Sequence, residues 1–66
     1  MSNTYTVNIE NTLENTERQI DISSNNPMNA HKDAYMKTNR YEEIRSICDV
    51  DGETVYDKDK GFYGKY

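Results

Sequence analysis

The sequence predicts a single α+β domain, in which a β-β-α-β-β chain forms a mostly antiparallel four-stranded sheet with one helix on one face. Three observations predict this fold. Residues 4–10 alternate between apolar and polar, Asn26-Pro27 has the chemistry of a helix start, and Asp51-Gly52 joins two β-prone runs. A chain of 66 residues is long enough for one domain only.

Two strands are predicted in the first third of the chain. Residues 4–10 and 18–23 both place apolar side chains on one face and polar side chains on the other, which is typical of half-buried strands. We expect the second strand to run antiparallel to the first. The polar residues 11–17 predict a connecting loop whose Leu13 fills part of the core. The strand residues predicted to face the core are Tyr5, Val7, Ile9, Ile20 and Ile22.

A helix is predicted over residues 27–39. Asn and Ser side chains in residues 24–26 can accept hydrogen bonds from free backbone N–H groups, and Pro27 suits the first helical position. Ala30 and Ala34 lie four residues apart, so we expect them to pack against the sheet. Asn39 is expected to end the helix as a left-handed cap. Three side chains lie off the alanine stripe and are interface candidates: Met28, Tyr35 and Met36.

A β-hairpin is predicted over residues 44–57. Asp51-Gly52 favours a two-residue type I′ turn, because both residues tolerate a positive φ. Such a turn places Cys48 opposite Val55, and Ile47 opposite Tyr56. The predicted faces are Cys48, Val50 and Val55 on one side, and Ile47 and Tyr56 on the other, so both faces are partly apolar. Residues 58–66 are expected to form a loose aromatic tail that either adds an edge strand or crosses the sheet.

Composition restricts the classes of function. The net charge is −4 and the pI about 4.7, which disfavours nucleic-acid binding and fits a partner with a basic surface. Mean hydropathy of −1.12 is low, but six tyrosines supply stiff, partly apolar surface that suits both a folded domain and a protein interface. A single cysteine, Cys48, and the lack of a long apolar run lead us to expect a cytoplasmic protein without membrane contact.

The sequence lacks residues that the motifs for catalysis and metal binding require. An EF-hand loop with Gly52 at position six would need a carboxylate where Ile47 stands and a glutamate where Lys58 stands. Cys48 and His31 are the only pair resembling a thiol and its base, and Cys48 is expected to be a small buried strand residue. We therefore expect a protein without enzymatic activity, cofactor or metal.

The residues predicted to contact a partner are acids and aromatics from the second half of the chain. The acids give this segment a local excess of negative charge that suits a basic groove, and the aromatics could anchor an interface. The acidic candidates are Asp49, Asp51, Glu53, Asp57 and Asp59. The aromatic candidates are Tyr35, Tyr56, Phe62 and Tyr63.

The order of these elements resembles small phage-encoded inhibitor proteins, including several anti-CRISPR proteins and RNA-polymerase inhibitors. The shared features are a leading strand, the short strand Ile20-Asp21-Ile22-Ser23, the alanine-bearing helix, an isoleucine-bearing strand around residues 44–47 and the Asp51-Gly52 hairpin. The resemblance implies a binding protein in the host cytosol that inhibits a larger host protein, such as a CRISPR effector or RNA polymerase.

Two alternative functions come from other features. Apolar side chains on both faces of the hairpin suggest a homo-oligomeric structural or scaffold protein, for example a homodimer. Lysines and tyrosines in residues 58–66 suggest nucleic-acid binding, although Asp57 and Asp59 interleave with the lysines and largely cancel their charge.

Overall fold

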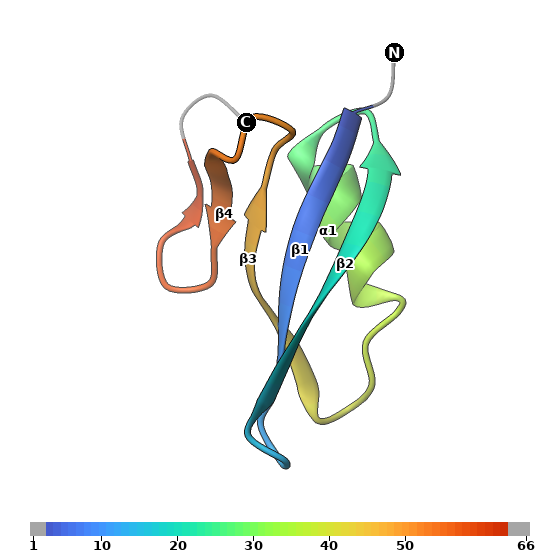
Figure 1. Ribbon diagram of the computed structural model, residues 1–66, viewed down its shortest axis with the longest axis vertical. Helices are drawn as coiled ribbons and strands as arrows, with labels where there is room; N and C mark the ends of the chain where they lie inside the picture. The colour runs from blue at the N-terminus through green and yellow to red at the C-terminus, as the bar shows by residue number, and fades with distance from the viewer. Residues whose placement is uncertain (1–2, 64–66) are drawn as a thin grey trace.

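The computed structural model describes residues 3–63, which form a five-stranded antiparallel sheet with one helix on one face (Figure 1). The strand order is β2-β1-β3-β4-β5. The elements are β1 (Asn3–Asn11), β2 (Thr16–Ser24), α1 (Pro27–Tyr35), β3 (Glu42–Cys48), β4 (Thr54–Asp57) and β5 (Gly61–Phe62). The α+β class and the single helix are confirmed. The predicted sheet lacked one strand, because β5 adds an edge from within the segment expected to be a loose tail; residues 64–66 of that segment lie outside the described range.

The first two strands form a long regular hairpin. They pair without a bulge from Asn3 opposite Ser24 to Asn11 opposite Thr16. The loop covers only residues 12–15, so the predicted loop was too long at both ends. Asn11 caps it by accepting hydrogen bonds from two backbone N–H groups of the loop. Leu13 lies at the tip with 66% of its surface exposed, and its predicted place in the core was wrong because the loop extends beyond the helix-covered part of the sheet.

Helix α1 begins as predicted and ends early. The Asn26 side chain accepts a hydrogen bond from the Asn29 N–H at 2.8 Å, and Pro27 occupies the first turn. The helix ends at Tyr35, and Met36 caps it in a right-handed conformation. Asn39 does not have the positive φ expected of a left-handed cap. Its side chain instead accepts from the Tyr41 N–H and shapes the turn into β3.

The core lies between α1 and one face of the sheet. Ala30 and Ala34 are fully buried, and their small side chains let the helix lie close to the strands. The alternation predicted for β1 is confirmed, and the partly buried Ile20 packs against the core from β2. The buried apolar residues are Tyr5, Val7, Ile9, Ile22, Ala30, Ala34, Ile44, Ile47 and Val55.

The β3–β4 hairpin has a different turn from the one predicted. Gly52 has φ of +86°, but Asp51 does not have a positive φ, which excludes type I′. The Gly52 N–H donates to the Asp49 carbonyl at 3.0 Å, and the Asp49 N–H donates to the Glu53 carbonyl at 2.9 Å. These bonds enclose a three-residue loop, residues 50–52, that combines a type I turn with a left-handed glycine.

This longer turn changes which residues face the core. Ile47 lies opposite Tyr56 as predicted, but Cys48 lies opposite Thr54, and the register shifts between these pairs. Val55 is the extra residue of the resulting bulge, and it is buried with Ile47. Val50 is 72% exposed. The predicted shared face of Cys48, Val50 and Val55 was therefore wrong, because it assumed a two-residue turn and no bulge, whereas the shared face of Ile47 and Tyr56 is confirmed.

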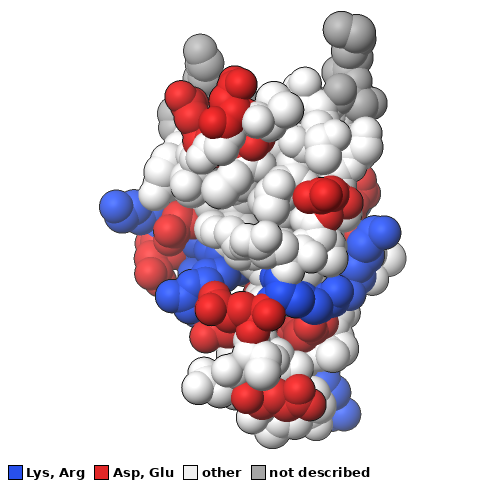
Figure 2. Space-filling view, viewed as in Figure 1, with Lys and Arg blue, Asp and Glu red and all other residues white. Residues whose placement is uncertain are grey.

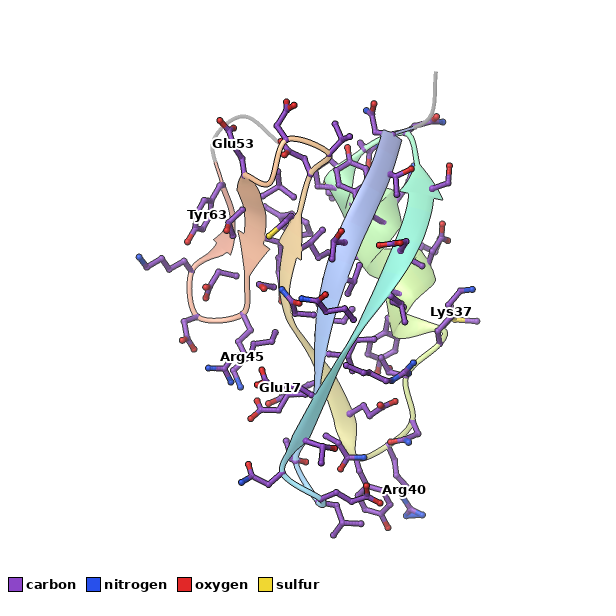
Figure 3. The ribbon with its side chains drawn as sticks, viewed as in Figure 1. Glu17, Lys37, Arg40, Arg45, Glu53 and Tyr63 are labelled. Carbon is purple, nitrogen blue, oxygen red and sulfur yellow. The ribbon has the colours of Figure 1, made fainter. Side chains whose placement is uncertain are left out.

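The face of the sheet away from α1, which we call the open face, is polar. The Asn8 side chain donates to the Ser46 hydroxyl at 2.8 Å, and the Thr6 hydroxyl donates to Asp21 at 3.3 Å. Ion pairs continue this face toward the β1–β2 loop (Figure 3). They join Arg45 to Glu10 and Glu17, and Lys58 to Glu10 and Glu43. This polar surface removes the apolar second face on which the scaffold alternative depended.

Candidate functional site

The strongest candidate for a contact surface is the loop between β3 and β4, residues 49–53, which we call the acidic loop. Asp49 fixes its shape, because its Oδ1 accepts hydrogen bonds from the Asp51 N–H and the Glu53 N–H, both at 2.9 Å. With that carboxylate turned inward, the two exposed acids that remain are Asp51 and Glu53. The exposed Val50 side chain directly precedes Asp51 in the loop. The loop therefore presents two carboxylates and one apolar side chain on a hydrogen-bonded backbone.

The acids within residues 3–63 fall into an ion-paired group and a group without ion pairs, and the acidic loop belongs to the second group together with Glu14, Asp21, Asp33, Asp57 and Asp59. Glu10, Glu17, Glu42 and Glu43 each form an ion pair with Arg18, Arg45 or Lys58. No ion pair within residues 3–63 involves an acid of the acidic loop. Figure 2 shows the consequence: red and blue mix over the lower part of this view, whereas the upper left end, where the acidic loop lies, is red only.

The other predicted acids lie elsewhere. Asp57 and Asp59 belong to the turn between β4 and β5, where the Asp57 carboxylate accepts from the Asp59 N–H at 2.8 Å. This turn and the acidic loop lie at opposite ends of β4 (Figure 1). The structure thus divides the five acids into two groups.

The predicted aromatic anchors are also divided. Tyr56 and Phe62 pack with His31 of α1 into an aromatic cluster, with ring centroids 4.7 Å apart for His31 and Tyr56 and 4.8 Å apart for Tyr56 and Phe62. Tyr35 is 67% exposed at the end of α1, which is separated from the acidic loop by the length of β3. The Tyr63 N–H donates to the Val55 carbonyl, and the Tyr63 side chain lies on the same side of the molecule as Glu53 (Figure 3). Among the predicted aromatics, Tyr63 therefore lies nearest the acidic loop along β4.

Four groups have shifted pKa values with clear causes, and the first is Arg18, whose pKa is raised by its hydrogen bond with Glu42. Burial within the aromatic cluster lowers the pKa of His31. Hydrogen bonding to Arg18 and to the Asn39 N–H lowers the pKa of Glu42, and hydrogen bonding to Glu43 raises the pKa of Lys58. Lys58, one of the lysines on which the nucleic-acid alternative depends, forms ion pairs with Glu10 and Glu43.

The two residues considered for nucleophilic catalysis lie on opposite sides of the sheet. His31 projects from α1 into the aromatic cluster. Cys48 pairs with Thr6 and Thr54 on the open face, and its sulfur lies 3.9 Å from the Thr54 hydroxyl. Across residues 3–63, no three His, Cys, Asp or Glu side chains are grouped so that they could hold a metal ion.

Comparison with known protein families, curated proteins and solved structures found no match to this chain. Within the described part of the chain, α1 is too short and too polar to cross a membrane.

Sequence reasoning missed two surface features. Val50 was placed on one strand face with Cys48 and Val55, rather than in the loop, because the turn was taken to contain only Asp51 and Gly52. The free edge of β2 was not considered, since a sequence pattern does not reveal the order of strands in a sheet. The one available indication was the absence of Pro and Lys, two residues that often protect an edge, from residues 16–24.

Proposed function

We propose that this chain is a non-enzymatic binding protein that places its acidic loop on the basic surface of a larger protein and thereby inhibits it. The observation that carries the proposal is the unpaired charge of Asp51 and Glu53 on a loop whose backbone is fixed by the Asp49 carboxylate. A fixed backbone lowers the conformational entropy lost on binding, and carboxylates form strong hydrogen bonds with arginine and lysine.

The proposed target is a protein whose basic groove normally holds nucleic acid. Carboxylates can occupy such a groove because they offer the same kind of charged oxygen acceptors as phosphates. Val50, and Tyr63 farther along the same side, would add apolar contacts beside the charges. The resemblance to phage-encoded inhibitors points to a CRISPR effector or an RNA polymerase as the class of target.

The test compares two charge reversals of equal size at the two ends of β4. The double variant Asp51→Lys/Glu53→Lys alters the acidic loop and keeps the structural Asp49. A control with the same change of net charge reverses Asp57 and Asp59 instead. Since Asp57 also shapes its turn, circular dichroism and thermal unfolding should first show that both variants are folded.

Binding is then measured with the immobilised full chain in a bacterial lysate, with added DNA as competitor. We expect the unaltered chain and the control to retain a nucleic-acid-binding protein that DNA displaces. We expect the acidic-loop variant to lose it, since each charged hydrogen bond contributes about 1.5–3 kcal/mol. Equal capture by all three chains, or capture of no protein, contradicts the proposal.

A further inference from the structure

The two edges of the sheet are very different. One edge is β5, which has two residues, and the other is β2, which has nine. Proteins usually protect a long edge with proline, lysine, a bulge or an inward-pointing charge, because its free backbone groups can pair with another strand. β2 contains no Pro or Lys and pairs with β1 without a bulge, so its protection is limited to three charged side chains, Glu17, Arg18 and Asp21. Its one basic residue, Arg18, is turned toward Glu42 and the Lys37 carbonyl.

The hydrogen-bonding direction of β2 follows from its register with β1. The Thr12 N–H donates to the Tyr41 carbonyl, so even-numbered residues of β1 direct their backbone groups toward β3. Odd-numbered residues of β1 then bond to β2, where their partners are even-numbered. The residues that direct N–H and C=O groups at the free edge are therefore Glu17, Gln19, Asp21 and Ser23.

We propose that a second copy of this chain pairs with the β2 edge, antiparallel, about a two-fold axis through Ile20. The two sheets would join into one of ten strands, five from each copy. This register pairs all nine residues of β2, with Gln19 opposite Asp21 of the second copy and Glu17 opposite Ser23 of the second copy. The inference does not rest on the acidic loop or on its proposed target.

Repulsion between like charges disfavours the two neighbouring registers relative to this one. Residues directly opposite each other in a strand pair point to the same side of the sheet. Both helices therefore lie on one side of the joined sheet only if even-numbered residues of one copy lie opposite even-numbered residues of the other. The two-fold axis must then pass through a residue of β2, so the neighbouring registers have their axis at the next residue on either side. An axis through Gln19 places Glu17 opposite Asp21 of the second copy, and an axis through Asp21 places two aspartates opposite each other. Like charges directly opposite each other destabilise a strand pair. The Ile20 axis avoids both conflicts and places two isoleucines together.

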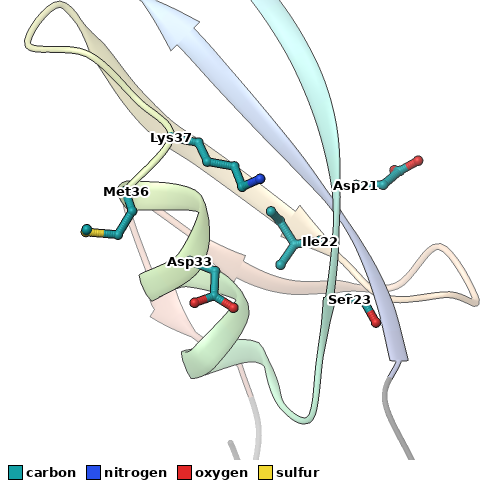
Figure 4. Close-up of a pocket in the computed structure, with 6 residues that line it drawn as sticks. All are labelled: Asp21, Ile22, Ser23, Asp33, Met36 and Lys37. Atoms are coloured by element: carbon teal, nitrogen blue, oxygen red, sulfur yellow. The ribbon is translucent and has the colours of Figure 1, made fainter.

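A groove and one exposed apolar side chain, Met36, accompany the free edge on the helix side. A groove of about 370 Å³ lies between β2 and α1, and its lining is mixed: two apolar side chains, Ile22 and Met36, and four polar or charged ones, Asp21, Ser23, Asp33 and Lys37 (Figure 4). Met36 is 80% exposed, and Ile20 is only partly buried although it packs against the core. A strand added to β2 would cover Ile20, and its side chains on this face would enter the groove beside Met36.

The test uses two substitutions at Gln19, which pairs with Asp21 of the second copy in the proposed register. Gln19→Lys creates two opposite-charge pairs per dimer, and Gln19→Glu creates two like-charge pairs. At about 0.2–1 kcal/mol per pair, the dimer dissociation constant should fall roughly 2- to 30-fold for the first variant and rise by a similar factor for the second. The controls Asp59→Asn and Lys60→Gln change net charge by the same amounts away from the edge, and should leave the constant nearly unaltered.

Sedimentation equilibrium of the full chain and its variants over a wide concentration range gives these constants. Weakening by both Gln19 variants would indicate an axis through Gln19, and no response to either would exclude the Ile20 register. A monomer at every concentration would overturn the proposal and leave the β2 edge for a strand of another protein. The variant Gln19→Pro removes an edge N–H that does not bond to β1, so a folded, monomeric product would further support pairing at this edge.

Discussion

Two valines of the β3–β4 hairpin give a direct test of its turn. Val55 is 2% exposed within the core cluster, whereas Val50 is 72% exposed in the acidic loop. The same substitution, valine to alanine, removes the same methyl groups at both positions. Any difference in effect therefore measures the difference in burial.

The magnitude follows from the buried groups. Removing two buried methyl groups costs about 1.6 kcal/mol at ~0.8 kcal/mol each, and the cavity left beside Ile47 raises the expected loss for Val55→Ala to about 1.5–3 kcal/mol. The whole domain should have roughly 3–10 kcal/mol of stability, at ~0.05–0.15 kcal/mol per residue. Val50→Ala should change the free energy of unfolding by less than about 0.5 kcal/mol.

Chemical denaturation followed by circular dichroism measures both effects. The Val55→Ala midpoint should fall while the denaturant slope stays constant, and its Tm should fall by roughly 6–20 °C. A loss of stability for Val50→Ala equal to or larger than that for Val55→Ala would refute the reasoning. It would mean that Val50 packs in the core and does not lie in an exposed loop.

Three further results are expected. Burial lowers the pKa of His31 below its ordinary value of 6.5, so stability should be full above that pH and decrease as the pH falls through it, and His31→Phe should abolish this decrease in a pH series of thermal unfolding. Asp49→Ala removes the acceptor of two backbone N–H groups and should cost about 1–3 kcal/mol in urea unfolding, while Asp51→Ala should have little effect. An added Cβ at Gly52 would meet nothing within 4 Å, so Gly52→Ala should cost only the backbone strain of a positive φ, about 1–2 kcal/mol by calorimetry.

Local sequence rules predicted the parts of the fold that depend on near neighbours. The alternation of Tyr5, Val7 and Ile9 identified β1, because one side of a strand faces the core. Asn26 identified the start of α1, and the spacing of Ala30 and Ala34 identified its buried side. Each of these features is set by residues within about one helical turn or a few strand positions.

The turn at Asp51-Gly52 shows where such rules fail. Aspartate before glycine fits both a type I′ turn and a type I turn followed by a left-handed glycine. The choice depends on Asp49, whose carboxylate accepts from two N–H groups of the longer loop. A one-residue error in the turn then moved Val50 and Val55 to the wrong surroundings.

The candidate site was predicted less completely than the fold. Acids close together in sequence were expected to form one group, but Asp57 and Asp59 lie at the other end of β4. Tyr56 and Phe62 were expected to face a partner, and they instead contact His31, which is distant in sequence. Such contacts depend on the position of α1 over β4 and β5, which only the assembled sheet defines.

The strand order has a consequence for how the chain folds. Three of the four strand pairings, β1–β2, β3–β4 and β4–β5, join consecutive strands, and only β1–β3 brings together segments distant in sequence. Hairpins between consecutive strands form in microseconds, whereas distant pairing must first overcome the entropy of closing a long loop. The docking of β3 on β1, with α1 packed across both, is therefore the step that should limit the folding rate.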